Sequence, residues 1–302
     1  MIISRKKLRI AVLPLIIVGI FLGLGFTVKK VWDRIDSDIY NHPRGEVTEK
    51  TPGNFDLSYR KVSFTSDEDI EIRGWYLPSA KSTNHCIILT PGKGENRWDM
   101  LEYAPFLVNG GFSVLLFDPR STGLSDGNRY GFGYFESRDL LNAMDFLIEQ
   151  KGISKIGLLG RSAGATASLL AAVDDSRVEA VIADSPYANL RLASKNFGDY
   201  SKDWFFQAFF PVYMFSAKLA LGVDIYSETN ALDKMGGVET PTFFIHGLKD
   251  DAVGYQNTEK LFERKPQPKR MWLVPDTAHV AAFENVPKQY KRKVLDFFRT
   301  YL

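Results

Sequence analysis

A serine between two glycines has the clearest potential for chemistry in this sequence. The pentapeptide Gly-Arg-Ser-Ala-Gly at residues 160–164 follows a short apolar run and precedes an alanine-rich segment. A serine at such a strand-to-helix turn is held out of the sheet, and small neighbours allow the tight bend and the close approach of another strand. We therefore predict that Ser162 is a nucleophile, the alternative being a plain glycine-rich turn.

A serine hydroxyl needs a base to take its proton, and histidine is the usual one. The chain has four histidines, His42, His85, His246 and His279. His42 lies in a polar stretch, His85 opens an apolar run and His246 ends one. His279 follows the last apolar run, in a loop expected at the carboxyl edge of a parallel sheet beside Ser162. We predict His279 as the base, and a solvated loop histidine is the alternative.

The base in turn needs a carboxylate that holds its tautomer and stabilises the imidazolium. Two adjacent carboxylates, Asp250 and Asp251, follow the apolar run that ends at His246. We favour Asp250, in which case Asp251 caps a helix or carries a surface charge. Asp184, after another apolar run, is a third and weaker candidate.

The elements that must position these residues alternate along the chain. Apolar or alternating runs predict strands at residues 58–65, 70–77, 86–89, 112–117, 156–159, 180–183, 242–245 and 271–274. Helical patterns cover residues 97–108, 134–149, 163–173, 256–262 and 284–301. Such alternation predicts an α/β fold with a mainly parallel sheet of eight strands, flanked by helices and opened by an antiparallel hairpin.

A long insertion separates the sixth and seventh predicted strands, at residues 188–235, and needs structure of its own. We predict a helical lid. Its aromatic residues are Phe197, Tyr200, Trp204, Phe205, Phe206, Phe209, Phe210, Tyr213 and Phe215. They either line an acyl pocket or contact lipid, or they simply bury themselves on the main domain.

Together these motifs resemble the α/β-hydrolase superfamily over about residues 55–302. The pentapeptide at 160–164 is similar to the nucleophile turn of that family, and serine, acid and histidine follow in the family's order. Residues 246–253, His-Gly-Leu-Lys-Asp-Asp-Ala-Val, are similar to its acid segment. That similarity selects Asp250 over Asp251.

Two further loops carry the resemblance. Residues 89–94, Leu-Thr-Pro-Gly-Lys-Gly, stand where the family has a His-Gly loop, with Pro91 in place of the histidine. By this match, the backbone N–H groups of Lys93 and Ala163 form the oxyanion hole. Residues 118–127 resemble a second family loop, which we interpret as structural.

The resemblance and the residues imply a serine hydrolase that cleaves carboxylic ester-type substrates through an acyl-enzyme, with no cofactor and no metal. A membrane segment and an aromatic lid favour small-molecule or lipid esters with apolar acyl groups. A peptidase or thioesterase of the same fold uses the same three residues. A catalytically silent, membrane-bound binding module is the alternative from another class.

The N-terminus predicts a membrane anchor. Residues 10–28 carry no charge, and a helix of this length spans most of the roughly 30 Å of a bilayer core. Four basic residues precede it, which favours an N-terminus in the cytoplasm and a catalytic domain outside. We thus expect an anchor at 1–30, a linker at 31–57 with at most a first helical turn, and the hydrolase domain at 58–302. Secretion after signal cleavage is the alternative.

Composition limits the partners. The formal net charge is +2, and all the basic excess lies in the first 30 residues, so the remainder is mildly acidic and no nucleic-acid partner is expected. Cys86 is the only cysteine, which excludes an intramolecular disulfide and a thiolate metal site. The oligomeric state stays open.

Overall fold

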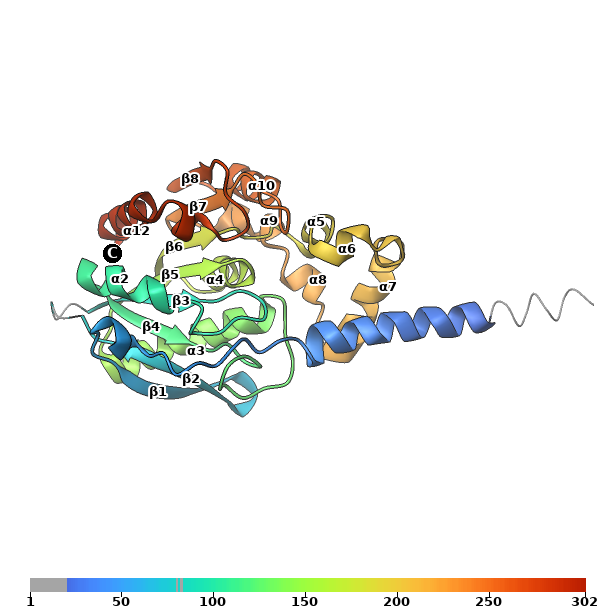
Figure 1. The fold of residues 1–302 in the computed structure, drawn as a ribbon, viewed down its shortest axis with the longest axis horizontal. Helices are drawn as coiled ribbons and strands as arrows, with labels where there is room; N and C mark the ends of the chain where they lie inside the picture. Colours follow the sequence, from blue (N-terminus) through green and yellow to red (C-terminus); the bar gives the residue numbers. More distant parts are fainter. Residues whose placement is uncertain (1–20, 80, 82–83) are drawn as a thin grey trace, which may run out of the picture.

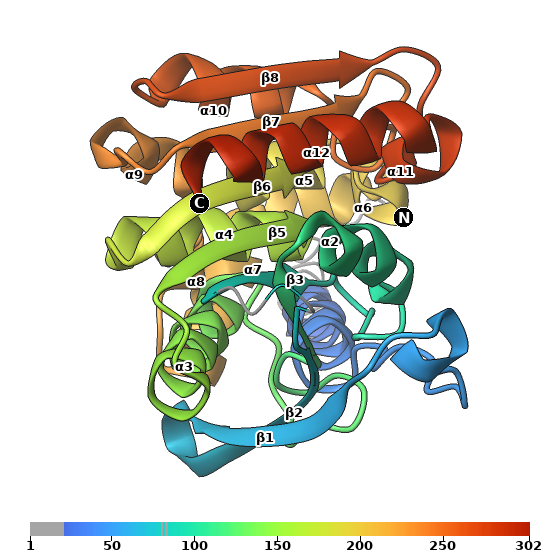
Figure 2. The ribbon, with the colours of Figure 1, turned by 90° about the vertical axis from the view of Figure 1, so that its left-hand side faces the viewer.

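The computed structural model describes residues 21–79, 81 and 84–302. Within these residues eight strands form one sheet, in the order β1-β2-β4-β3-β5-β6-β7-β8 (Figures 1 and 2). The strands are β1 (Arg60–Ser66), β2 (Ile70–Leu77), β3 (His85–Thr90), β4 (Ser113–Phe117), β5 (Lys155–Arg161), β6 (Val178–Asp184), β7 (Thr242–Gly247) and β8 (Lys269–Val274). Strand β2 pairs antiparallel with β1 and β4, and the other neighbours pair in parallel. The predicted sheet is thus confirmed.

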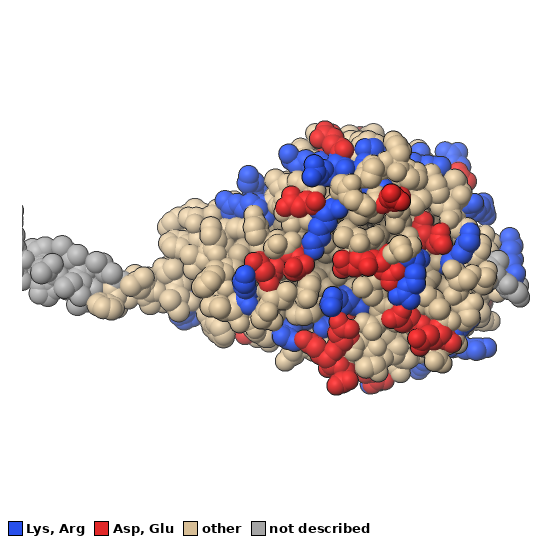
Figure 3. Space-filling view, turned by 180° about the vertical axis from the view of Figure 1, so that it is seen from behind, with Lys and Arg blue, Asp and Glu red and all other residues tan. Residues whose placement is uncertain are grey.

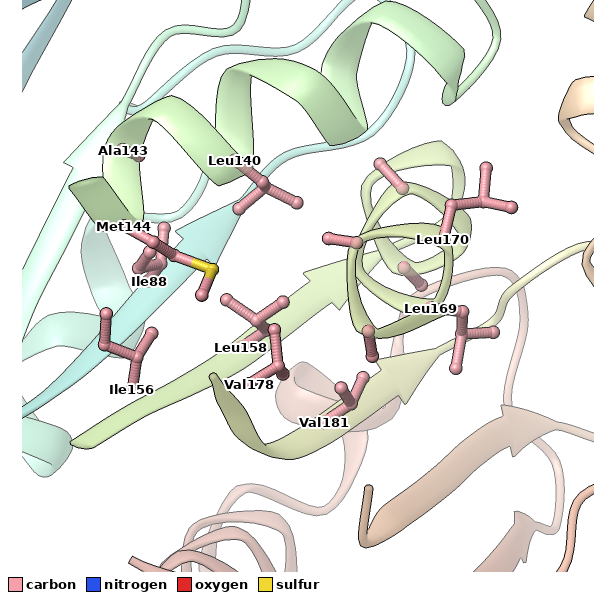
Figure 4. Packing of buried hydrophobic residues seen from close by; sticks show 14 of the residues in the cluster. Ile88, Leu140, Ala143, Met144, Ile156, Leu158, Leu169, Leu170, Val178 and Val181 are labelled. Atoms are coloured by element: carbon pink, nitrogen blue, oxygen red, sulfur yellow. The ribbon is translucent and has the colours of Figure 1, made fainter. Parts of the chain in front are cut away.

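Helices cover both faces of the sheet, because its central strands are apolar on both sides. One face carries α2 (Ala104–Gly110), α11 (Ala282–Asn285) and α12 (Pro287–Tyr301). The other face carries α3 (Tyr134–Lys151), α4 (Ala163–Asp174), α9 (Ala231–Lys234) and α10 (Gln256–Arg264). Figure 4 shows the second layer, where Leu140 and Met144 of α3 approach Ile88 and Leu158 of the sheet. This packing holds the strand ends, and the loops that follow them, in one place.

Two predicted helices differ from those observed. The helix expected at 97–108 begins only at Ala104, because the amide and side chain of Asn96 bond to neighbours in a turn: Asn96 N–H donates to Asp99 at 2.9 Å and Trp98 N–H donates to Asn96 at 3.0 Å. The helix expected at 284–301 is broken before Pro287, whose ring disfavours helical backbone in the preceding residue.

The insertion between β6 and β7 is helical. It contains α5 (Leu190–Ser194), α6 (Gly198–Lys202), α7 (Trp204–Leu221) and α8 (Ile225–Glu228), and ends with α9. Asp203 caps α7 by accepting the N–H groups of Phe205 and Phe206, and Gly222 ends it in the left-handed conformation at φ 71°. Figure 1 shows α5 to α8 gathered at one end of the sheet.

A helix at the N-terminus packs against this insertion. Residues 21–35 are helical and continue into a π-helical turn, η1 (Asp36–Tyr40). Residues 31–40 are thus helical over more than the single turn expected at the start of the linker. The reason is that Val31, Ile35 and Ile39 recur every four residues and form a buried apolar stripe against α7.

The predicted membrane segment lies largely outside the described residues, which begin at residue 21. In the part of the chain that the structure covers, none of the helices combines the length and the apolar character needed to cross a membrane.

Candidate active site

Ser162 occupies a strained turn between β5 and α4. Its backbone has φ 52° and ψ −121°, and its N–H donates to the carbonyl of Asp184 at 2.8 Å. The flanking glycines are required by close approach: a Cβ on Gly160 would lie 2.2 Å from the carbonyl oxygen of Gly164, and a Cβ on Gly164 would lie 2.2 Å from that of Pro91. The turn therefore depends on these two residue types, as the sequence pattern indicated.

The structure brings the predicted serine, histidine and aspartate together. Nε2 of His279 lies 2.9 Å from Oγ of Ser162, and its Nδ1 lies 2.6 Å from Oδ2 of Asp250. The three side chains follow β5, β8 and β7, which are neighbours through β6 in the parallel part of the sheet. Their carboxyl ends share one edge, which explains how residues 117 positions apart meet.

Asp250 is buried, with only 7% of its surface exposed. Its Oδ1 accepts the backbone N–H groups of Ala252 and Val253, each at 2.9 Å. Burial alone would raise the pKa of this carboxyl, but the contacts with His246 and His279 and the backbone donors outweigh it and hold the pKa well below its usual range. The carboxylate is therefore ionised whenever a histidine base would work.

His246 is a neighbour of Asp250 that the sequence analysis assigned only to the end of a strand. It is fully buried, and its Nε2 lies 2.9 Å from Oδ2 of Asp250. The angle at this contact is unfavourable for a hydrogen bond. Its Nδ1 lies 2.7 Å from the hydroxyl of Thr258. The four-residue spacing of His246 and Asp250 was the available signal, since it allows a loop to fold the carboxylate back onto the imidazole.

The other candidates lie in different surroundings. Asp251 is exposed. Asp184 is buried beneath the turn, accepts hydrogen bonds from Tyr290 and Ser185, and has its pKa raised by burial. Nδ1 of His42 lies 2.9 Å from the carbonyl of Pro43.

The loop after β3 passes directly beside Ser162. A Cβ placed on Gly92 would lie 3.3 Å from that of Ser162. Within the described residues, the backbone N–H groups of Lys93 and Ala163 donate to no other protein atom, which leaves both free for a substrate oxygen. Pro91, which replaces the histidine of the resemblance, presses its carbonyl against Gly164. The Lys93 side chain turns away to bond Asp38 of η1 at 3.0 Å.

An apolar pocket opens at Ser162, between the loops of the sheet and the insertion. Its wall consists of Asp38, Lys93, Tyr130, Phe132, Ala163, Tyr187, Leu190, Ala193, Ser194, Phe197, Tyr200, Phe206, Phe210, Tyr213, Met214 and Val253. Part of the insertion's aromatic set thus lines this pocket, and part is buried against the N-terminal helix. Among the residues described, no group of three His, Cys, Asp or Glu side chains is suited to a metal ion.

The sequence is similar to a known protein family and to several bacterial proteins. Residues 99–302 match the Peptidase_S9 family, described as the prolyl oligopeptidase family. The uncharacterized protein YqkD of Bacillus subtilis (strain 168) is 26% identical over 314 residues, covering 97% of each chain. The uncharacterized protein YfhR of Escherichia coli (strain K12) is 25% identical over 282 residues, or 89% of each chain.

Solved structures agree with the family match. The Pyrococcus furiosus esterase Pf2001 is similar with a TM-score of 0.72 and 25% identity, covering 86% of this chain and 98% of that one. The acetyl xylan esterase from Paenibacillus sp. R4 shares the fold at 19% identity and a TM-score of 0.66, covering 85% and 87%. The fold, the family match and these neighbours make the protein a serine hydrolase of the α/β type. The chain belongs to the prolyl oligopeptidase family.

Proposed function

We propose that this protein hydrolyses carboxylic ester-type substrates, with Ser162 as nucleophile, His279 as general base and Asp250 as the carboxylate that orients the base. The observation that carries the proposal is the continuous line of contacts from Ser162 Oγ through His279 to Asp250, at 2.9 Å and 2.6 Å. Such contacts match the roles of nucleophile, base and orienting acid in acyl transfer.

The proposed reaction has two steps. Oγ of Ser162 bonds to the ester carbon while its proton moves to Nε2 of His279, and the oxygen that gains charge is held by the N–H groups of Lys93 and Ala163. The bond to the alcohol then breaks, and His279 returns the proton to the leaving oxygen. Water repeats the sequence on the acyl-enzyme, so that acid is released and the Ser162 hydroxyl restored. Asp250 stays ionised throughout and stabilises the imidazolium.

The pocket supports substrates with apolar acyl groups. Its wall is rich in aromatic rings, notably Phe206, Phe210 and Tyr213 of α7, and burial of an acyl chain there would be favourable at about 25 cal/mol per Å². The similar protein Pf2001 of Pyrococcus furiosus is described as an esterase, which supports ester over amide cleavage. The family's name also points to peptides, so the test must include an amide substrate.

The test combines covalent labelling with a substrate series. A fluorophosphonate probe should label the purified wild type and leave Ser162→Ala unlabelled, with heat-denatured wild type as the control for non-specific reaction. p-Nitrophenyl esters of increasing chain length should be cleaved faster than the matched p-nitroanilides. Folded wild type that takes up no probe would indicate a binding module, and preferred cleavage of anilides would indicate a peptidase.

We also propose that residues 10–28 anchor the protein in a membrane, with the N-terminus in the cytoplasm and the hydrolase domain on the other side. Large apolar side chains are exposed along residues 21–32 and on the outer face of α7. They are Phe21, Leu22, Leu24, Phe26, Val28, Trp32, Trp204, Val212, Phe215 and Leu219. In the view of Figure 3, the narrow end that carries these helices has few charged side chains, which suits a lipid surface.

One relative adds support for the membrane. The yeast protein described as uncharacterized membrane protein YNL320W is 24% identical over 233 residues, covering 76% of each chain. The protein should resist extraction by alkaline carbonate and dissolve only in detergent, and the hydrolase domain should be protease-sensitive in intact cells stripped of their outer layers. A soluble mature chain lacking its first residues would instead favour signal cleavage and secretion.

A further inference from the structure

A buried carboxylate in the N-terminal helix has no part in the reaction as proposed. Asp38 lies in η1 and is only 3% exposed, whereas Asp33, on the preceding turn, is exposed. An ionised carboxylate out of water is costly unless it is paired and hydrogen-bonded. The partners of Asp38 therefore show what its position serves.

Asp38 joins three separate parts of the chain. Its Oδ1 accepts hydrogen bonds from Nζ of Lys93, at 3.0 Å, and from the hydroxyl of Tyr200 in α6. Its Oδ2 accepts from the hydroxyl of Tyr213 in α7 at 2.9 Å and lies 3.4 Å from Nε of Arg34. The Arg34 guanidinium stacks on the Tyr200 ring, 3.6 Å from its centre. One carboxylate thus connects the N-terminal helix, the insertion and the loop after β3.

That loop is the one beside the nucleophile. Its other side is already fixed, because the N–H of Gly92 donates to Glu95 at 2.6 Å and Glu95 pairs with Arg161 at 2.7 Å. Among the described residues Lys93 has one ion pair, with Asp38. Its Nζ also lies 4.8 Å from the centre of the Phe132 ring and 5.7 Å from that of Tyr130, and its N–H remains free. The ion pair with Asp38 therefore links the residue that carries this N–H directly to the N-terminal helix.

We propose that Asp38 is a positioning residue for the proposed esterase: by pairing with Lys93 it fixes the oxyanion-hole loop, and it does so only while residues 31–40 are docked on the insertion. The N-terminal helix then completes the active site as well as leading toward the membrane. This inference rests on the function proposed above.

The charge of Asp38 is essential to this arrangement. Burial lowers the pKa of the Lys93 ammonium, and the nearby Asp38 carboxylate opposes that shift. Asparagine would keep the size of the side chain but remove the carboxylate that pairs with Lys93 and Arg34. Lys93 would then gain from turning toward water, and its backbone would move with it.

The experiment compares Asp38→Asn with Asp33→Asn in the full-length protein, using a short p-nitrophenyl ester. Asp33 is the matched control, since it is exposed and pairs with Lys29 at the surface. We expect Asp38→Asn to lower kcat by about 10- to 100-fold with KM changed less than about threefold, as when a catalytic group is displaced by about 1 Å. Asp33→Asn should stay within about twofold of wild type.

Lys93→Met tests the same link from the other end, because it removes the side-chain tie and keeps the backbone N–H. It should reproduce the loss in kcat, and the double variant should lose no more than either single one. It also serves if Asp38→Asn does not fold. An unchanged kcat, a change in KM alone, or additive losses would each overturn the proposal.

A readout without turnover separates this inference from the proposed function. Hydrogen exchange at residues 91–96 should rise in Asp38→Asn and not in Asp33→Asn. If wild type neither labels with fluorophosphonate nor cleaves esters, the proposed function fails. Exchange at 91–96 that is identical in all three proteins would instead refute the Asp38 link itself.

Discussion

The two walls of the pocket are held together in different ways. On the sheet side, Ser162, His279 and Asp250 sit on short turns at strand ends, fixed by backbone hydrogen bonds and by glycine contacts that admit no Cβ. On the opposite side, the N-terminal helix meets α7 mainly through apolar side chains. Its polar contacts there come from Asp38, from Tyr40 and from the ion pair of Lys30 with Asp203. The first wall is rigid because the sheet sets its geometry.

The second wall has no such framework. It joins segments more than 160 positions apart in the chain, and among the described residues each hydrogen bond between them involves at least one side chain. Local unfolding generally starts where few backbone hydrogen bonds link an element to the rest. We therefore expect changes on the sheet side to affect chemistry most, and changes on the helix side to affect docking of the helix.

The largest expected effect separates two adjacent carboxylates on the sheet side. Asp250→Asn should lower kcat by about 10³- to 10⁴-fold, because the amide stabilises the wrong imidazole tautomer and no longer the imidazolium. Asp251→Asn, at an exposed position, should change kcat less than about twofold. Steady-state kinetics with a p-nitrophenyl ester measure both, and the opposite pattern would transfer the role to Asp251.

On the helix side, Ile35→Ala should weaken docking by about 2 kcal/mol or more, because Ile35 is fully buried against the insertion. Trypsin cleavage at Lys30 and Arg34 should then be roughly 30-fold faster. Leu24→Ala, exposed on the same helix, is the matched control and should leave the rate near that of wild type. Equal cleavage rates in both variants would mean that the apolar stripe does not hold the helix.

A smaller effect is expected at His246, which contacts Asp250. His246→Gln should lower kcat by about tenfold, since a contact with a charged group is worth about 1.5 kcal/mol or more. Thr258→Val, which alters only the far side of that imidazole, should cost about two- to threefold. Loss of activity in Thr258→Val that matched His246→Gln would show that the hydroxyl, and not the contact with Asp250, is what matters.

The smallest expected effect is on the free energy of unfolding at acidic pH. The pKa of Asp250 is lower in the folded protein than in the unfolded chain, so the unfolded state binds this proton more tightly. The stability that ionised Asp250 contributes is thus complete above about pH 4 and lost as pH falls further. Urea unfolding from pH 7 to 3 should show wild type approaching Asp250→Asn in acid. A difference that stays constant with pH would contradict the lowered pKa.

How far the sequence predicted the structure differs between the two walls. Strand positions were predicted within a few residues, since apolar runs of strand length carry a local signal. The prediction of a helix at 97–108 was wrong at its start, because hydrogen bonds of the Asn96 and Asp99 side chains stabilise a turn there. The spacing of apolar residues gives no information about such hydrogen bonds. His246 was placed at the end of a strand, while its contact with Asp250 depends on how the following loop folds back.

The linker expected at 31–57 shows the limit most clearly. Its first ten residues include three aspartates, so the segment looked polar as a whole. The four-residue spacing of Val31, Ile35 and Ile39 therefore gave no clear helical signal. A stripe of three apolar residues in a charged stretch can face solvent, lipid or protein, and nothing local chooses among them.

By itself, the sequence determined the α/β architecture and the candidate serine, histidine and aspartate, because strand periodicity, the glycine-bounded turn and chain order are all encoded over short distances. Only the tertiary structure decided which carboxylates and histidines touch and that the N-terminal helix forms part of the pocket. The physical reason is that these contacts join side chains of separate elements, and their energies exist only after the sheet has brought those elements together.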